Sequence, residues 1–424
     1  MHNLTTKYKW QRVKNYLWHF PQSLLANISL AFPSRKLTLI GVTGTDGKTT
    51  TSILIKQILL NAGIKTEAFT TISSPGLHTT SPDAKVLQHA LKEMSQNGVT
   101  HCVLETTAHG LDQFRFLGCH FKVGVITNVT HEHLDDFPSI DLYTKAKSRL
   151  FNASEIKIFN ADDDSYVMLK KLFPKSLSYS INKKSNFQAK NIIIDKEKMS
   201  FNVNGKKIIT DSNYSYQAYN ILAALAVTSS LGLPTELVAK TVKIFPETKG
   251  RRENIKNDFN FKTIVDFAHT PNALAVTLSS LKKVTAGRLI VIFGATGGRD
   301  QTKRPIMGKN VSEIADIAII TADDTRTEKI ADINKQIIAG INPKNSVEIN
   351  ALNPSISNPK LFHYANIPNR QDAFNLAIKI AKAGDTIIAC GKGHESTILH
   401  GTTEYPWSEA EAFRTAFRLK TQNV

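Results

Sequence analysis

Short apolar runs alternate with longer segments of helical periodicity along most of the chain. The first apolar run, residues 37–40, is followed by a glycine-rich turn and a helical pattern over 52–62. Further strand candidates are 102–104, 123–127 and 156–159, and further helix candidates are 82–96, 142–151 and 217–230. This alternation predicts a doubly wound parallel α/β sheet with helices on both faces.

The same alternation restarts after an interruption. Short alternating segments over 186–210, with Asn204-Gly205 between them, predict a β-hairpin, and 246–250 reads as a linker. Strands are then expected at 263–266, 289–293, 317–321 and 386–389, with a final helix near 408–419. We therefore expect a segment over 1–36, a central domain over 37–245 and a Rossmann-like α/β C-terminal domain over 246–424.

The first 45 residues carry six Lys/Arg and no acidic residue, and 16–32 is rich in aromatic and aliphatic side chains. Such a segment could lie on a membrane surface as a basic amphipathic helix, a peripheral contact through 1–36. It could instead pack on the next domain. Pro21 is expected to interrupt a long helix, which favours packing.

The composition is typical of a globular protein that binds anionic ligands. The chain has 424 residues, of which 41% are hydrophobic and 21% charged, as in globular proteins. Cys102, Cys119 and Cys390 have no metal-site or disulfide spacing, and no apolar run reaches membrane-spanning length, so we expect a reduced, cytoplasmic protein. The net charge of +17 suits polyanionic ligands such as nucleotides; without a matching motif we expect no nucleic-acid partner.

The glycine-rich turn is the clearest chemical signal. In Gly41-Val-Thr-Gly-Thr-Asp-Gly-Lys-Thr-Thr-Thr51, glycines let backbone N–H groups approach a polyphosphate at a helix N-terminus. Lys48 can reach the terminal phosphates and the Thr49 hydroxyl can bind Mg²⁺. This short loop resembles the nucleotide loop of the Mur ligase family, which implies ATP binding by Gly44, Thr45, Asp46, Gly47, Lys48, Thr49 and Thr50.

Three further segments resemble MurE-type members of that family: 104–115, 128–135 and 143–151. The resemblance implies two Mg²⁺ ions held by Thr49, Glu105, His133 and a carbamylated Lys147, with Lys48, Glu105, His133 and Lys147 as catalytic residues. Lys145 lies nearby and leaves the position of the modified lysine open. By the same resemblance, Thr79, Thr80, Gln113 and Arg115 contact the acceptor, although Ala108 replaces a family serine.

The second half carries four more such segments, 250–253, 265–271, 294–305 and 391–395. They imply a hinge near Gly250 and nucleotide contacts from Arg251, Asp266 and His269. Asn220, in a segment resembling Phe-Asn-x-x-Asn, would contact the adenine; Gln217 replaces the first Asn of that pattern.

Residues 323–326 align with the Asp-Asn-Pro-Arg motif that selects diaminopimelate in the family. Arg326 is kept, whereas Asp324 and Thr325 replace Asn and Pro. An arginine suits the distal carboxylate of diaminopimelate better than the ammonium of lysine. The resemblance implies an amino-acid site of Arg299, Asp323, Arg326, Gly391 and Glu395.

Together the resemblances imply an ATP-dependent ligase of cell-wall peptides that adds an amino acid to a muramoyl-L-Ala-D-Glu acceptor through an acyl phosphate. The open alternatives are another ligase of the superfamily, of folylpolyglutamate or polyamino-acid type, and a non-catalytic ATP-binding scaffold. MurE-type enzymes have a further domain before the nucleotide loop that holds the UDP end of the acceptor. Here the loop begins near residue 41, so we expect UDP to contribute little. We expect small-molecule substrates and a monomer.

Overall fold

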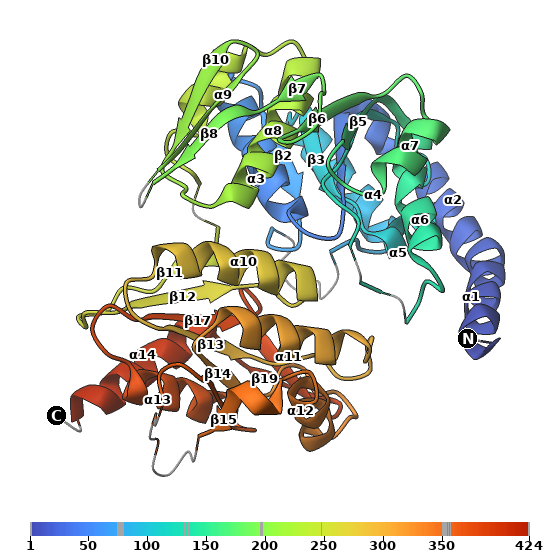
Figure 1. Cartoon of the computed structure of the whole chain (residues 1–424). Coiled ribbons are helices and arrows are strands. Elements are labelled where there is room, and N and C mark those ends of the chain that lie inside the picture. The colour runs from blue at the N-terminus through green and yellow to red at the C-terminus, as the bar shows by residue number, and fades with distance from the viewer. Residues whose placement is uncertain are drawn as a thin grey trace. The chain divides into compact units, whose positions relative to one another are not determined.

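The computed structural model divides into two compact units, Met1–Pro246 and Glu247–Val424 (Figure 1). It describes residues 2–73, 80–130, 132–133, 135–195, 198–246, 248–349, 354, 356 and 358–422. Within these residues, no helix combines the length and apolarity needed to cross a bilayer.

The first unit is built on a seven-stranded sheet whose neighbouring strands are all parallel. The strand order is β2-β3-β1-β4-β5-β6-β7. The strands are β1 (Thr38–Thr43), β2 (Thr66–Phe69), β3 (His101–Glu105), β4 (Phe121–Ile126), β5 (Ser154–Asn160), β6 (Leu177–Ser180) and β7 (Phe187–Gln188). The order reverses beside β1, and ligands of open α/β sheets bind at the carboxyl ends of strands at such a reversal.

Helices cover both faces of this sheet, as the apolar pattern predicts (Figure 1). Ile40 and Val42 of β1 join one core, whereas Leu39 joins the other, because successive strand residues face opposite sides. The first core includes α3 (Lys48–Asn61), α8 (Ser215–Ser230) and α9 (Thr235–Thr241), and the second includes α4 (Ala84–Gln96), α5 (Ala108–Asp112), α6 (Ile140–Asn152) and α7 (Tyr166–Leu172). Helix α3 begins at Lys48, four residues before the expected start, because the apolar periodicity begins later than the helix.

The hairpin expected over 186–210 is present and is part of a larger element. Strands β8 (Lys190–Ile194), β9 (Met199–Val203) and β10 (Lys206–Thr210) form an antiparallel three-stranded sheet. Asn204 and Gly205 have φ values of 51° and 75°, the positive values that a tight type I′ turn requires. Met199 and Phe201 pack this small sheet onto the first core.

The N-terminal segment is helical almost throughout, so the prediction that Pro21 interrupts a long helix was wrong. α1 (His2–Lys14) continues through a π-helical turn, η1 (Asn15–His19), into α2 (Phe20–Ser29), followed by the 3-10 turn η2 (Pro33–Lys36). Pro21 lies in the first turn of α2. The preceding turn is wider than an α-helical one, which relieves the clash between a proline ring and the carbonyl four residues earlier.

The second unit has its own seven-stranded sheet, ordered β11-β12-β17-β13-β14-β16-β15, with only β11 antiparallel to its neighbour among these strands. The strands are β11 (Arg251–Asn254), β12 (Lys262–Asp266), β13 (Leu289–Phe293), β14 (Ile317–Ile320), β15 (Ser346–Glu348), β16 (Phe362–Asn366) and β17 (Thr386–Cys390). The helices are α10 (Pro271–Val284), α11 (Lys303–Ile314), α12 (Ile330–Ile338), α13 (Arg370–Ile380) and α14 (Glu409–Gln422), with a 3-10 turn η3 (Pro343–Asn345). A hairpin that the sequence did not predict, β18 (Thr397–His400) and β19 (Thr403–Pro406), follows β17.

Candidate active site

The glycine-rich turn follows β1 and is held by the end of β4. The backbone N–H of Thr45 donates to the carbonyl of Asn128 at 2.9 Å, and the N–H of Asp46 donates to Asn128 Oδ1 at 2.9 Å. Gly44 has φ +145°, and a Cβ atom there would lie 1.8 Å from the Thr127 hydroxyl oxygen. Only glycine can come this close to Thr127 with a positive φ, so contacts within the protein fix the shape of the turn.

Beside this turn, a buried carboxylate meets a hydroxyl. Thr49 Oγ1 lies 3.0 Å from both carboxylate oxygens of Glu105, which ends β3. The N–H of Thr71 donates to the same carboxylate at 3.1 Å. Lys48 Nζ donates to the carbonyl of Thr45 at 2.9 Å. A threonine hydroxyl and a carboxylate are the hard oxygen ligands that Mg²⁺ prefers, so these residues fit that ion.

Lys147 is buried against the same turn. Its Nζ donates to the carbonyl of Gly44 at 2.7 Å and lies 4.1 Å from the centre of the Tyr143 ring. Burial, and then the charge of Lys48, hold the pKa of Lys147 well below its usual value, which favours the neutral amine. Lys145, the other candidate, is exposed.

His133 lies in a cluster that the sequence did not reveal. Its ring meets the His109 ring edge-on, with centroids 4.9 Å apart, and lies 5.9 Å from Tyr143. His109 Nε2 is 2.9 Å from Asp136 Oδ2. The hydrogen bond from His109, and then the contact with Lys7, lower the pKa of Asp136. Ligand atoms of His109, His133 and Asp136 lie within 4.8 Å of one another, close enough to share a metal ion.

Two of the residues assigned to the acceptor, Gln113 and Arg115, follow the end of α5. Thr79 lies outside the described residues, whereas Thr80 Oγ1 accepts from Thr71 at 2.9 Å. Gln113 Oε1 accepts from the guanidinium of Arg115 at 2.8 Å. Arg115 also donates to the carbonyl of Ser81 and lies 3.5 Å from a carboxylate oxygen of Asp83. The guanidinium is therefore held by groups of the chain itself, which fixes its direction.

Asn220, on α8, lies beside the glycine-rich turn. Its Nδ2 donates to Gln217 Oε1 at 2.6 Å, and its Oδ1 accepts from the Thr51 hydroxyl at 3.3 Å. A Cβ atom on Gly47, where φ is +81°, would lie 2.5 Å from Asn220 Oδ1. The structure thus brings Asn220 against the loop, and Gln217 orients its amide.

The nucleotide residues expected in the second unit gather around Phe267. The Arg251 guanidinium lies 4.4 Å from the centre of that ring, and the His269 ring lies 4.6 Å from it. The Asp266 carboxylate, at the end of β12, accepts from the N–H groups of Arg252 and Ala268 at 2.9 Å each. Burial raises the pKa of Asp266.

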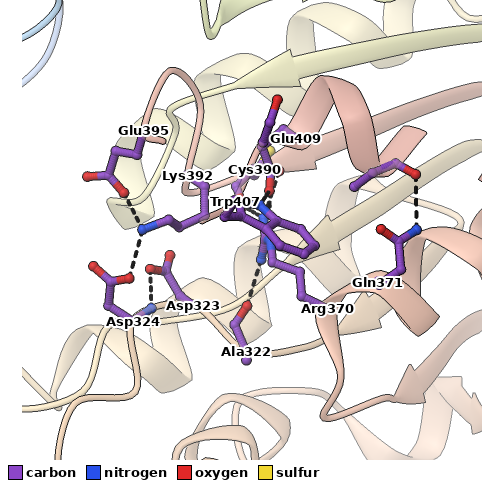
Figure 2. Close-up of polar contacts among 12 residues, drawn as sticks. Ala322, Asp323, Asp324, Arg370, Gln371, Cys390, Lys392, Glu395, Trp407 and Glu409 are labelled. Atoms are coloured by element: carbon purple, nitrogen blue, oxygen red, sulfur yellow. Dashed lines mark hydrogen bonds and ion pairs between the residues drawn. The ribbon is translucent and has the colours of Figure 1, made fainter. Parts of the chain in front are cut away.

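The carboxyl ends of β14 and β17 bring together an acidic cluster around one lysine (Figure 2). Buried Lys392 lies 2.7 Å from Asp324 Oδ1 and also pairs with Glu395. Burial raises the pKa of Glu395 to about 7, against the opposing effect of Lys392. Burial also acts to raise the pKa of Asp323, but the charges of Lys392 and Arg370 outweigh it and the pKa is lowered. A Cβ atom on Gly391 would lie 2.6 Å from Asp323 Oδ2, so glycine is required there.

Arg326 stands beside the 294–305 loop. Its backbone forms a bridge with His400, and a Cβ atom on Gly298 would lie 3.5 Å from its side chain. Arg326 Nε is buried without a hydrogen-bond partner among the described residues. Arg299, next to Gly298, is exposed. An arginine with an unused donor is suited to a further anionic group.

Arg370, which sequence reasoning missed, connects the segments at the carboxyl ends of β14 and β17 (Figure 2). It pairs with Glu409 at 2.8 Å, both side chains being buried, and donates to the carbonyls of Ala322 and Cys390. Those carbonyls belong to the segments that carry Asp323 and Lys392. Arg370 is the first residue of α13 and Glu409 is the first residue of α14, and no spacing pattern in the sequence links the two. Lys392, by contrast, could have been found from the motif at 391–395.

The geometry can be compared with known proteins. Residues 42–228 match the Mur ligase middle domain, and residues 250–393 match the family model described as "Mur ligase, glutamate ligase domain". The chain is 35% identical over 406 residues to a UDP-N-acetylmuramoyl-L-alanyl-D-glutamate–2,6-diaminopimelate ligase of Alkaliphilus metalliredigens, covering 92% of this chain and 78% of that protein.

Solved structures of two other proteins are similar to this chain. A UDP-N-acetylmuramoyl-L-alanyl-D-glutamate–2,6-diaminopimelate ligase aligns with a TM-score of 0.60 at 28% identity, covering 91% of this chain and 79% of the other. A folylpolyglutamate synthase of Mycobacterium tuberculosis aligns with a TM-score of 0.70 at 15% identity, covering 94% and 95%. At that identity, the second likeness concerns the fold alone.

Proposed function

Because this chain belongs to the Mur ligase family of ATP-dependent ligases, we propose that it adds meso-diaminopimelate to a muramoyl-L-alanyl-D-glutamate acceptor. The observation that carries the proposal is the convergence of Lys48, Thr49, Glu105 and Lys147 on one glycine turn. The names of the relatives support the choice of acceptor and amino acid.

The residues around the turn suit the charge of phosphoryl transfer. The backbone N–H groups of the loop and the Lys48 ammonium would bind the phosphates of ATP. Thr49 and Glu105 would hold one Mg²⁺, and His133 with Lys147 a second; bound Mg²⁺ neutralises charge that develops on the phosphoryl oxygens.

The reaction joins two molecules in two balanced steps. An acceptor carboxylate oxygen attacks the γ-phosphorus of ATP, and the bond to ADP breaks, giving an acyl phosphate. The amine of the amino acid then attacks the acyl carbon, phosphate leaves, and the amine loses a proton. Lys48 would stabilise negative charge in the first step, so the protein would contribute mainly positioning and electrostatics.

Lys147 is proposed to carry a carbamate. A neutral amine attacks CO₂ at carbon, forms an N–C bond and loses a proton, and the product is an anion with two oxygen ligands. The lowered pKa of Lys147 favours the neutral amine, and its contact with the Gly44 carbonyl puts that amine beside the glycine-rich turn. Lys145 is exposed on the same helix.

The proposed nucleotide residues are divided between the two units. Lys48 and Asn220 belong to the first, and Arg251, Asp266 and His269 to the second.

The amino-acid specificity is tested at Arg326. Arg326→Ala should lower kcat/KM for diaminopimelate by about a hundredfold, because the distal carboxylate would lose its partner in a shielded site. Lysine lacks that carboxylate and should be affected far less. Phosphate release with each amino acid gives both numbers, and Arg299→Ala should show a smaller loss. Equal losses for both amino acids would contradict the assignment of Arg326.

The reaction itself is tested with a panel of acceptors. We expect phosphate release only when muramoyl-L-Ala-D-Glu and diaminopimelate are both present, with a product mass that corresponds to one added residue. Comparing the KM values of acceptors with and without UDP measures how much UDP contributes to acceptor binding. Release with a folate acceptor and glutamate would instead support the folylpolyglutamate alternative, and no release with any pair would support the scaffold.

Glu395 should impose a pH dependence on amino-acid binding. Its pKa of about 7 means that the carboxylate, the form that can bind an α-ammonium group, is lost as the pH falls below about 7. We expect kcat/KM for diaminopimelate to rise toward pH 7 and then level off. Glu395→Gln should lower the kcat/KM value reached above pH 7 and remove the rise in kcat/KM below it. If the variant kept the same rise, the pH dependence would belong to another group.

A further inference from the structure

The N-terminal helices expose many large apolar side chains. Trp10, Leu17 and Trp18 have 70%, 75% and 59% of their surface exposed. Most of the exposed apolar residues recur at spacings of three and four, as one side of a helix requires. We call this the outer face; its residues are Trp10, Val13, Tyr16, Leu17, Trp18, Phe20, Leu24, Leu25 and Ile28.

The same helices are attached to the first unit by polar contacts and by a few aromatic ones, in which the rings of Tyr16 and Phe20 lie 5.2 and 5.3 Å from that of Phe114. Asn15 Nδ2 donates to Asp112 Oδ2 at 2.6 Å, and Arg12 Nη1 lies 2.8 Å from Asp112 Oδ1. Asn27 Nδ2 donates to the carbonyl of Leu117 at 2.7 Å. α2 also contacts α4, and in Figure 1 α1 and α2 run along one side of the first unit. Trp10, Leu17 and Trp18 nevertheless remain exposed, whereas a surface helix usually packs its large apolar side chains inward.

The charges that the N-terminal segment itself carries are of one sign. Lys9 and Lys14 on α1 and Arg35 and Lys36 in η2 are exposed, and no acidic residue precedes Asp46. Lysines beside exposed tryptophan and leucine match a surface that is anionic at its headgroups and apolar beneath. Two copies of this face would bring lysine against lysine without an acidic partner from the segment, which disfavours self-association.

We infer that the outer face binds the surface of an anionic phospholipid bilayer, with the helices lying in the plane of the headgroups. Trp10, Tyr16 and Trp18 suit the interface because they have an apolar body and a polar edge. The contacts of Asn15 and Asn27 would keep the first unit attached to the helices at the membrane. This inference goes beyond the proposed function and does not depend on it.

The test is flotation of the full chain with vesicles of phosphatidylglycerol and phosphatidylcholine, compared with phosphatidylcholine alone. We expect binding to the anionic vesicles, weakened by salt, with a blue shift of tryptophan emission. The triple variant Trp10→Ser/Leu17→Ser/Trp18→Ser should lower the partition coefficient by about tenfold or more, since it removes three large apolar side chains. Lys9→Glu/Lys14→Glu should lower it by at least about fivefold.

A matched control replaces apolar residues that are equally exposed elsewhere. Val167→Ser/Ile193→Ser/Ile244→Ser removes three such side chains outside the outer face and should leave partitioning unchanged. Circular dichroism verifies that each variant is folded. Equal flotation of wild type and the triple variant, or no flotation at all, would overturn the inference. A doubled mass in light scattering that the triple variant abolishes, without vesicle binding, would make the face a dimer interface instead.

Discussion

Replacing Lys147 by alanine should lower kcat by about a thousandfold or more. The variant loses the anionic ligand proposed for one Mg²⁺, and the charge stabilisation that a metal supplies is several kcal/mol, each 1.36 kcal/mol being about tenfold in rate. The buried position of Lys147 on the Gly44 carbonyl motivates this prediction. Phosphate release under saturating substrates measures it.

Lys145→Ala is the matched control, since Lys145 is exposed on the same helix; it should change kcat by less than about twofold. Acetate should restore part of the activity of Lys147→Ala. The modification has its own readout: wild-type protein supplied with ¹³C-bicarbonate should show a carbamate carbon resonance that Lys147→Ala lacks. A variant with normal kcat would remove Lys147 from the mechanism.

Replacing Arg370 by leucine should destabilise the second unit by about 3–5 kcal/mol, because Glu409 would remain buried without its partner. The carbonyls of Ala322 and Cys390 would also lose a donor. Urea unfolding can be followed by the emission of Trp407, whose indole donates to Glu409 at 2.6 Å. A Trp10→Phe/Trp18→Phe background removes the other tryptophans.

The comparison pair is Arg414 with Glu411, which is exposed on α14. Arg414→Ala should cost less than about 1 kcal/mol. Arg370→Leu/Glu409→Leu should recover much of the stability lost in the single variant, since no charge is left unpaired. A loss in Arg370→Leu as small as that of Arg414→Ala would show that the pair does not brace the site.

The order of strands and helices could be read from the sequence because it depends on local spacing. Apolar runs identified β3, β4, β12 and β13. Once the strands are parallel, the residues that follow them share one edge of each sheet. That is why Glu105 and Asp266 could be placed at strand ends before the fold was known.

Boundaries were less accurate where local chemistry competes with the apolar period. The helix after the nucleotide turn begins at Lys48, in a polar threonine run that carries no apolar stripe. Pro21 was expected to end a helix, but a π turn before it lets the helix continue. Neither outcome follows from a pattern of apolar positions.

The sequence by itself determined the nucleotide turn, the two α/β units and the motifs at their strand ends. Only the tertiary structure distinguished buried Lys147 from exposed Lys145, joined His109 to Asp136, paired Arg370 with Glu409 and turned the apolar side of α1 and α2 outward. The physical reason is that local periodicity follows from backbone hydrogen bonding within an element. Burial and pairing of single polar side chains depend instead on which distant segments the fold brings together, and such pairs leave no period in the sequence.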